Sequence, residues 1–182
     1  MRRRHILRRG AAALAVGLTA GCAAKADGGK DTPTAAQRQT PVHGDLPALP
    51  VEERWAVAGR SIEDAASADV ADADAFETAV ADGGPAVEKL TKRGKKLELK
   101  ATPSDAATRG VVTDVGHVAG AYAALVRSDD SFERVSVTLL DGSKRPFGSF
   151  QVVTAWAKRY VDGEWTATEY GEAVLGTLKT KS

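Results

Sequence analysis

Four side chains in the second half of the sequence are of the types that transfer protons in enzymes. They are a carboxylate, an imidazole and two phenols, at Asp114, His117, Tyr122 and Tyr160. Such groups act as general acids and bases when a pocket holds them within hydrogen-bond distance of a ligand. The alternative is that His117 is a surface or hydrogen-bonded histidine and that the tyrosines belong to the core. We favour this alternative, because the two other histidines, His5 and His43, precede the folded part and leave little room for a catalytic triad.

An acidic cluster at Asp69, Asp72 and Asp74 is a second candidate site. Carboxylate oxygens bind calcium, but a dedicated calcium loop also has a glycine at its sharp turn and a terminal bidentate glutamate. This segment has neither, so we favour a solvated turn between two helices. The sequence also lacks a His/Cys metal spacing, a glycine-rich phosphate loop and a Gly-x-Ser-x-Gly motif. We therefore predict no metal and no cofactor.

A basic group surrounds Gly94 and consists of Lys92, Arg93, Lys95 and Lys96. Positive side chains at the C-terminus of a helix interact favourably with the helix dipole. Contact with anionic lipid headgroups is the alternative. We favour the interpretation as a helix end.

The single cysteine, Cys22, follows a segment that is typical of an export signal. Residues 1–9 are strongly basic, residues 10–20 form a short apolar stretch, and Ala20-Gly21 directly precedes the cysteine. A positive segment stays on the cytoplasmic side while the apolar stretch enters the membrane, and small residues fit a peptidase site. Because one cysteine forms no intramolecular disulfide, the fold must be held by its core.

Leu18-Thr19-Ala20-Gly21-Cys22 resembles the lipobox of bacterial lipoprotein precursors, although Thr19 stands where that family prefers leucine. The resemblance implies that residues 1–21 are removed and that Cys22 receives a diacylglycerol. It also implies that the protein is held by this lipid at the extracytoplasmic face of the cell membrane. An ordinary signal peptide and an uncleaved anchor are the alternatives.

The run Arg3-Arg4-His5-Ile6-Leu7-Arg8 also resembles the twin-arginine export signal, with Arg3 and Arg4 as the pair. This resemblance implies export of an already folded domain. A generic arginine-rich signal, used by the general secretion route, is the alternative, and both stay open.

Residues 22–50 are predicted to form a disordered tether behind the lipid. The segment contains four prolines, few large apolar residues and no periodicity. It cannot bury enough surface to offset the entropy lost on ordering. A random coil of this length would hold the domain roughly 30 Å from the lipid.

The charge balance of the mature chain excludes one class of partner. The sequence has 25 basic and 24 acidic residues, and five arginines but no acid precede Cys22, so the mature chain is mildly acidic. Binding to nucleic acid depends on clustered lysines and arginines that neutralise phosphates. We therefore expect no nucleic-acid partner.

Residues 51–176 are predicted to fold as a single α+β domain, with 177–182 as a flexible tail. The helical spacing of Trp55, Ala58 and Ile62 predicts a helix over 51–67. A second helix is expected over 75–80, and a third over 85–93, because Pro85 suits a first helical turn. The apolar pattern of 114–127 favours a further helix, although a strand fits almost as well.

The strands are expected mainly in the second half of this domain. Apolar and polar residues alternate at 97–99 and at 135–139, as they do in half-buried strands. Two further strands are expected over 150–160 and 165–170. Asp141-Gly142 and Asp162-Gly163 are hairpin signals that join the last three strands. The fold class predicted is α+β, with N-terminal helices packed on a curved antiparallel C-terminal sheet.

This order of elements is similar to the nuclear-transport-factor-2-like (cone) superfamily. An Asp-Gly-x-Trp hairpin is common there, and Asp162-Gly163-Glu164-Trp165 has that form. The resemblance covers 51–172 and implies a pocket between the curved sheet and its helices, in which enzymes of that class place acid and base groups. It carries over no functional residue.

These features together predict a membrane-anchored extracytoplasmic lipoprotein with a non-enzymatic accessory domain. The domain would bind a protein partner of the envelope or a small apolar ligand. One alternative is a small cone-fold enzyme, isomerase or hydrolase-like, in which Asp114 or His117 is the base. Another is a structural spacer in the envelope.

Overall fold

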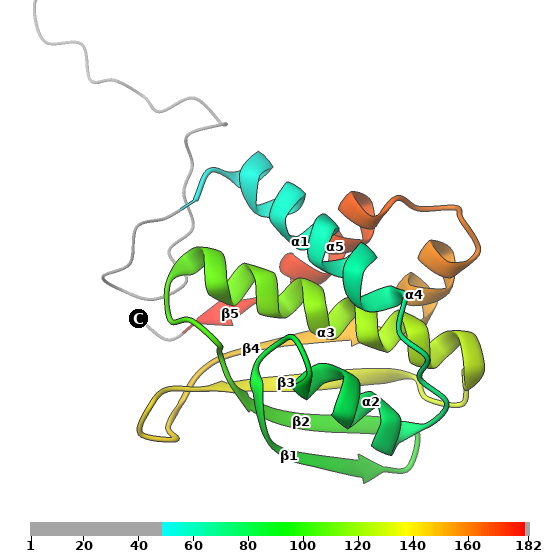
Figure 1. Ribbon diagram of the computed structural model, residues 1–182, viewed down its shortest axis with the longest axis horizontal. Coiled ribbons are helices and arrows are strands. Elements are labelled where there is room, and N and C mark those ends of the chain that lie inside the picture. The colour runs from blue at the N-terminus through cyan, green and yellow to red at the C-terminus, as the bar shows by residue number, and fades with distance from the viewer. Residues whose placement is uncertain (1–48, 181–182) are drawn as a thin grey trace, which may run out of the picture. The chain divides into compact units, whose positions relative to one another are not determined.

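The computed structural model describes residues 49–180, which form an α+β fold with helices on one face of a sheet (Figure 1). The predicted α+β class, with helices packed on a sheet, is therefore confirmed. The signal segment, Arg3, Arg4, Cys22 and almost the whole tether lie outside the described residues. The helices are α1 (Val51–Ala66), α2 (Ala73–Ala81), α3 (Thr108–Ser128), α4 (Thr154–Val161) and α5 (Ala167–Leu175). Within residues 49–180, no helix has the length and apolar character that crossing a membrane requires.

The sheet contains five strands in the order β1-β2-β3-β4-β5. The strands are β1 (Ala86–Arg93), β2 (Lys96–Thr102), β3 (Arg134–Leu140), β4 (Pro146–Val153) and β5 (Lys179–Thr180). Three of the pairings are antiparallel, but β2 pairs with β3 in parallel. The sheet is thus mixed and not wholly antiparallel as expected. The reason is that α3 connects β2 to β3 as a crossover and returns the chain in the same direction.

One face of the sheet packs on the helices and the other faces solvent. On β2, Leu97, Leu99 and Ala101 are buried, while the alternating charged residues are exposed. On β3, the alternating residues Val135, Val137 and Leu139 are buried next to those of β2, and the last residue of the strand, Leu140, is buried as well. The period-two pattern that predicted both strands is therefore confirmed, and it divides the sheet into an apolar face and a polar face.

The central helix α3 confirms the helix predicted over 114–127. It is buried on almost every side, which explains why its sequence shows no single apolar stripe. Two glycines let α1 lie directly against it. A Cβ at Gly116 would lie 2.5 Å from the carbonyl oxygen of Ala58, and one at Gly120 would lie 2.5 Å from that of Ile62. Any larger side chain at these positions would force α1 away.

The helix predicted over 85–93 is wrong, because these residues form strand β1. Pro85 is buried just before the strand, and β1 pairs with β2 along its length as a hairpin. The basic group around Gly94 therefore lies on a β-hairpin and not at a helix end. Gly94, with φ of +58°, supplies the left-handed conformation at the hairpin turn.

The strands predicted over 150–160 and 165–170 are also corrected. Strand β4 ends at Val153, and the chain continues as α4 and α5. Asp162-Gly163 is the turn between these two helices and not a hairpin. A capping box stops α5 from fraying, because the Thr166 side chain accepts from the Glu169 N–H while the Glu169 carboxylate accepts from the Thr166 N–H. Strand β5 lies within the segment that was expected to be a tail.

Candidate functional site

A cleft of about 730 Å³ opens where α1, α2 and α3 meet. This volume is within the range of small-molecule binding sites. Its lining combines acidic, hydroxyl and alanine side chains with a single histidine: Ser61, Asp64, Ala65, Ala68, Asp69, Ala75, Thr78, Ala79, Asp82, Gly83, Thr113 and His117. None of these residues comes from the sheet, so the cleft belongs to the helical layer alone.

Hydrogen bonds hold the elements around the cleft in place. The Ser61 hydroxyl on α1 donates to the Thr113 carbonyl on α3 over 2.7 Å. This bond uses the hydroxyl hydrogen of Ser61 and links the two helices. On α2, the Asp72 carboxylate accepts from the N–H groups of Asp74 and Ala75. Asp72 is therefore the N-cap of α2.

His117 is the one histidine that lines the cleft. It is half-buried, and its Nε2 lies 2.9 Å from the Ala79 carbonyl oxygen at the end of α2. Because a carbonyl only accepts, Nε2 must carry the proton, and in the neutral imidazole Nδ1 is then an acceptor. Within residues 49–180, Nδ1 has no hydrogen-bond partner. His117 can thus offer one acceptor to a ligand.

The turn after α2 covers the His117 ring closely. A Cβ at Gly84 would lie 2.5 Å from the imidazole Cδ2, and one at Gly83 would lie 2.9 Å from Cε1. Only glycines allow this turn to pass over the ring without moving it. His117 therefore helps to position the α2–β1 connection as well as lining the cleft.

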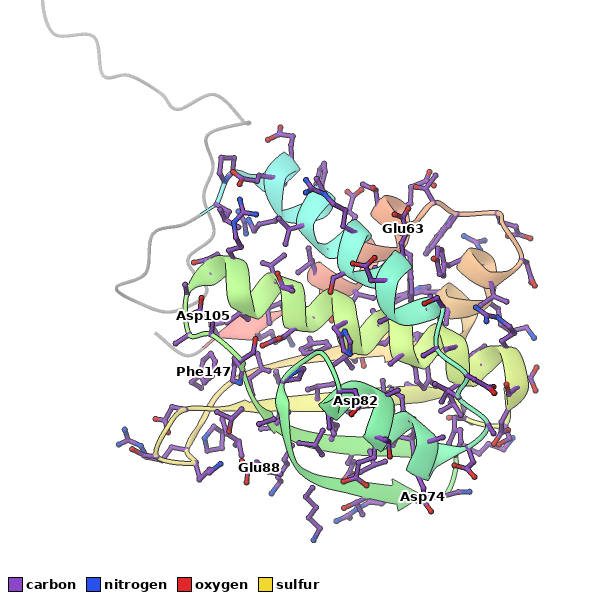
Figure 2. The ribbon with its side chains drawn as sticks, viewed as in Figure 1. Glu63, Asp74, Asp82, Glu88, Asp105 and Phe147 are labelled. Atoms are coloured by element: carbon purple, nitrogen blue, oxygen red, sulfur yellow. The ribbon has the colours of Figure 1, made fainter. Side chains whose placement is uncertain are left out.

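The cleft carries negative charge. Asp64, Asp69 and Asp82 are exposed, and none of the cations in residues 49–180 forms an ion pair with them. Asp82 follows the C-terminal end of α2, whereas Asp74 lies at its other end (Figure 2). Alanines of α1 and α2 line the same cleft, and their methyl groups supply apolar contact. This arrangement suits a cation with an aliphatic body.

Asp114 lies outside the cleft although it is less than one helical turn from His117. The residue is 1% exposed, and both carboxylate oxygens accept from Ser104, one from the N–H at 2.7 Å and the other from the hydroxyl at 2.8 Å. Burial raises the pKa of Asp114, while the bonds from Ser104 lower it by less. Asp114 therefore holds the β2–α3 loop onto α3.

The two predicted phenols are structural as well. Tyr122 is fully buried, and its hydroxyl lies 2.7 Å from the Thr154 hydroxyl, which itself donates to the Phe132 carbonyl. Tyr122 must therefore be the donor to Thr154. Tyr160 is half-buried, and its ring stacks on that of Tyr170 with centroids 5.4 Å apart. Of the four candidates, the structure brings only His117 to the cleft.

The acidic cluster does not come together as a metal site. Asp69 lines the cleft, Asp72 caps α2 and Asp74 lies in the first turn of α2. Across residues 49–180, no group of three or more His, Cys, Asp or Glu side chains is placed to hold a metal ion.

Sequence reasoning missed Asp64, Asp82 and the two glycines that cover His117. Asp64 and Asp82 are ordinary polar positions in their own helices, and no spacing links them, because they are brought together only by the packing of α1 and α2 on α3. The Gly83-Gly84 pair was a signal that could have been used, since two glycines between elements indicate a close approach of the backbone.

Comparison with known proteins gives one match. A family model described as a domain of unknown function (DUF8159) matches residues 66–182. The match includes α2, the whole sheet and α3 to α5, and it begins at the last residue of α1. No curated protein and no solved structure matches the chain significantly.

Proposed function

The chain belongs to the DUF8159 family, and for this member we propose a non-enzymatic binding domain that holds a small organic cation in the cleft between α1, α2 and α3. In this proposal a lipid on Cys22 holds the domain at the extracytoplasmic face of the membrane. The ligand class is an amine with an aliphatic chain, either a free polyamine or a lysine side chain of an envelope protein.

The observation that carries this proposal is the set of unpaired carboxylates above an alanine surface. Elsewhere on the domain, Asp130 and Glu164 pair with cations, and other exposed acids without an ion pair to a described residue, such as Glu52, do not line this cavity. Asp64, Asp69 and Asp82 line one cavity without such a partner. Because they are exposed, their attraction for a cation should be modest and should weaken as salt screens it. Methylene groups of the ligand would pack on Ala65, Ala68 and Ala79.

His117 adds a polar contact of a different kind. Its Nδ1 accepts a hydrogen bond when the ring is neutral, so it can receive an N–H from a protonated amine.

The enzyme alternative has less support. General acid–base catalysis needs at least one free titratable group beside the ligand, and a second to return the proton. The Asp114 oxygens are both engaged by Ser104, and the Tyr122 hydroxyl is engaged by Thr154. Of the four acid–base candidates named from the sequence, only His117 lines the cleft, and among residues 49–180 no nucleophilic side chain is hydrogen-bonded to it.

The proposal is tested by titrating the full chain with spermidine and following binding by isothermal titration calorimetry. We expect binding that weakens by at least about tenfold when Asp64, Asp69 and Asp82 are all changed to asparagine, a loss of about 1.4 kcal/mol or more. The matched control changes Glu52, Glu133 and Glu172 to glutamine. These residues are exposed and lie outside the cleft, and the net charge changes by the same amount.

Equal weakening in both triple variants would show that spermidine responds only to net charge, and the cleft would then be excluded as its site. Absence of spermidine binding to the unmodified chain would also overturn the proposal. A further check is Gly84→Ala, which should shift His117 and weaken binding while all three carboxylates remain.

A further inference from the structure

The face of the sheet that points away from the helices carries most of the unpaired positive charge of the domain. Strand register places Lys89 opposite Lys100, Arg93 opposite Lys96, and Lys96 beside Arg134, so that their side chains share one face. Lys179 lies on the same face opposite Ser149. We call this surface the open face, with the cations Lys89, Arg93, Lys96, Lys100, Arg134 and Lys179.

Two acids on β1 and β2 are neutralised by ion pairs. Glu98 pairs with Arg93 over 3.0 Å, and Glu88, on the β1 edge of the sheet (Figure 2), pairs with Lys144. The other five cations of the open face form no ion pair with any described residue. The open face is therefore net positive, although the described part of the chain contains more acids than bases.

Three cations of the helical layer form ion pairs. Arg109 pairs with Glu53, Lys158 pairs with Asp130 over 2.8 Å, and Arg159 lies 3.6 Å from Glu164. The same layer contains the three unpaired acids of the cleft. Charge is thus separated across the domain, with a positive sheet face and a negative cleft in the layer that covers the opposite side.

Hydroxyl groups lie between the cations of the open face. Two shallow grooves, of about 260 and 380 Å³, share Ser136 and Thr138. Thr91 extends one groove towards β1, and Ser149 extends the other towards β5. Serine and threonine hydroxyls can donate to phosphate oxygens, and lysines beside them supply the charge.

We propose that the open face docks onto the anionic headgroups of a lipid bilayer. The cations lie on β1, β2, β3 and β5, so they cover the width of the sheet and match an extended charged surface better than a single polymer chain. The hairpin turn between β1 and β2 adds Lys95 beside them. The acidic cleft is on the other side, and repulsion between its carboxylates and the bilayer favours the same orientation.

Chain length is consistent with this contact. If Cys22 carries a lipid, the segment between Cys22 and α1 can extend at most about 100 Å. The open face would therefore stay within reach of the bilayer, at a high local concentration of headgroups. Docking in this orientation would turn the cleft away from the membrane, towards ligands arriving from outside. The inference does not depend on what the cleft binds.

Co-sedimentation of the full chain with lipid vesicles tests this inference. The vesicles contain phosphatidylcholine with or without about 30 mol% phosphatidylglycerol at about 0.1 M salt, and the first variant changes Lys89, Lys100 and Lys179 to glutamine. Each lysine near an anionic surface contributes roughly 1 kcal/mol, about fivefold in affinity. We expect the variant to bind the anionic vesicles at least about 30-fold more weakly than the unmodified chain.

The control variant changes Arg60, Lys158 and Arg159 to glutamine, which removes the same charge from the helical layer. It should bind the anionic vesicles as the unmodified chain does, and binding to pure phosphatidylcholine should be equal for all three proteins. Equal weakening in both variants would overturn the inference, because net charge alone would then explain binding. Retained binding by the open-face variant would overturn it too.

A competition arm separates the bilayer from a soluble polyanion. If polyphosphate bound the open face tightly while the anionic vesicles did not, the inference would be wrong and a polymer would be the partner. Loss of spermidine binding would leave the vesicle result unaffected. Cation binding in the cleft and bilayer docking of the open face can therefore be disproved independently.

Discussion

Asp114 and His117 lie less than one helical turn apart on α3, yet only His117 meets the cleft. The difference comes from their neighbours. Ser104 approaches Asp114 from the loop before α3 and occupies both of its oxygens, whereas Ala79 engages only one nitrogen of His117. The type of a residue therefore does not show whether its side chain remains free to act on a ligand.

The three tyrosines of the chain give a direct test of how the core is built. Burial raises the pKa of Tyr122 from its ordinary value of 10.0 to about 12, and it also raises the pKa of Tyr160 and of Tyr170. In the native protein, absorbance at 295 nm should therefore show little tyrosinate at pH 10. The unfolded protein should titrate near that pH.

The sign of the linked effect on stability follows from the same shift. A raised pKa in the folded state means that the neutral phenol is preferred there, so its stabilisation is complete below about pH 10 and is lost as the pH rises through about 12. Tyr122→Phe should flatten this alkaline loss and cost roughly 1 kcal/mol at neutral pH, because the bond to Thr154 is removed. Early appearance of tyrosinate in the native protein would contradict the burial described above.

Among the helices, the contact between α1 and α3 decides whether the cleft exists. Ser61 and Asp64 reach it from α1, and Thr113 and His117 reach it from α3, so a change in the distance between the helices alters every wall. Gly116 and Gly120 set that distance, because their missing side chains let the backbones approach.

Gly116→Ala should lower the free energy of unfolding by about 1–3 kcal/mol, measured by urea denaturation. Alanine favours a helix over glycine by about 1 kcal/mol. A net loss in the free energy of unfolding would therefore have to come from the clash with Ala58. The control is Gly142→Ala in the β3–β4 turn, where a Cβ would meet nothing within 4 Å. It should change stability by less than about 0.5 kcal/mol. An equal effect at both positions would mean that the close helix contact does not matter.

At the scale of the whole molecule, two features concern the membrane, namely the proposed lipid on Cys22 and the open face. They differ in their dependence on salt. A covalent lipid holds through the hydrophobic effect, whereas the open face would act through charge, and at about 1 M salt the Debye length is only about 3 Å. A membrane fraction washed at high salt therefore isolates the contribution of the lipid.

Cys22→Ala should move the protein from the salt-washed membrane fraction of an expressing bacterium to the soluble fraction, as detected by immunoblotting. The control is Thr19→Leu, which restores the residue preferred in a lipobox and should keep the protein in the membrane. Retention of Cys22→Ala after the wash would contradict lipidation at this position. It would favour an uncleaved N-terminal anchor.

Local sequence patterns determined several elements correctly. The helices α1 and α2, the strands β2 and β3 and the turn at Asp141 follow from residues close together in the chain, because side-chain periodicity already records which face is buried. The α+β class follows from the order of these patterns. The lipidation motif is local too, and the lipid on Cys22 stays a prediction because that residue lies outside the described part of the chain.

Only the tertiary structure decided the rest. The segment of β1 was predicted as a helix, and the segments of α4 and α5 were predicted as strands, because short segments show too little periodicity to separate the two. Pairing with β2 makes the first a strand, and packing on α3 makes the other two helices. The cleft requires Asp64 and Asp82 from different helices, and the open face requires cations from four strands. Such surfaces depend on the parallel β2–β3 pairing and on the close contact of α1 with α3. Neither is encoded by local periodicity, because both arise from contacts between residues distant in the chain.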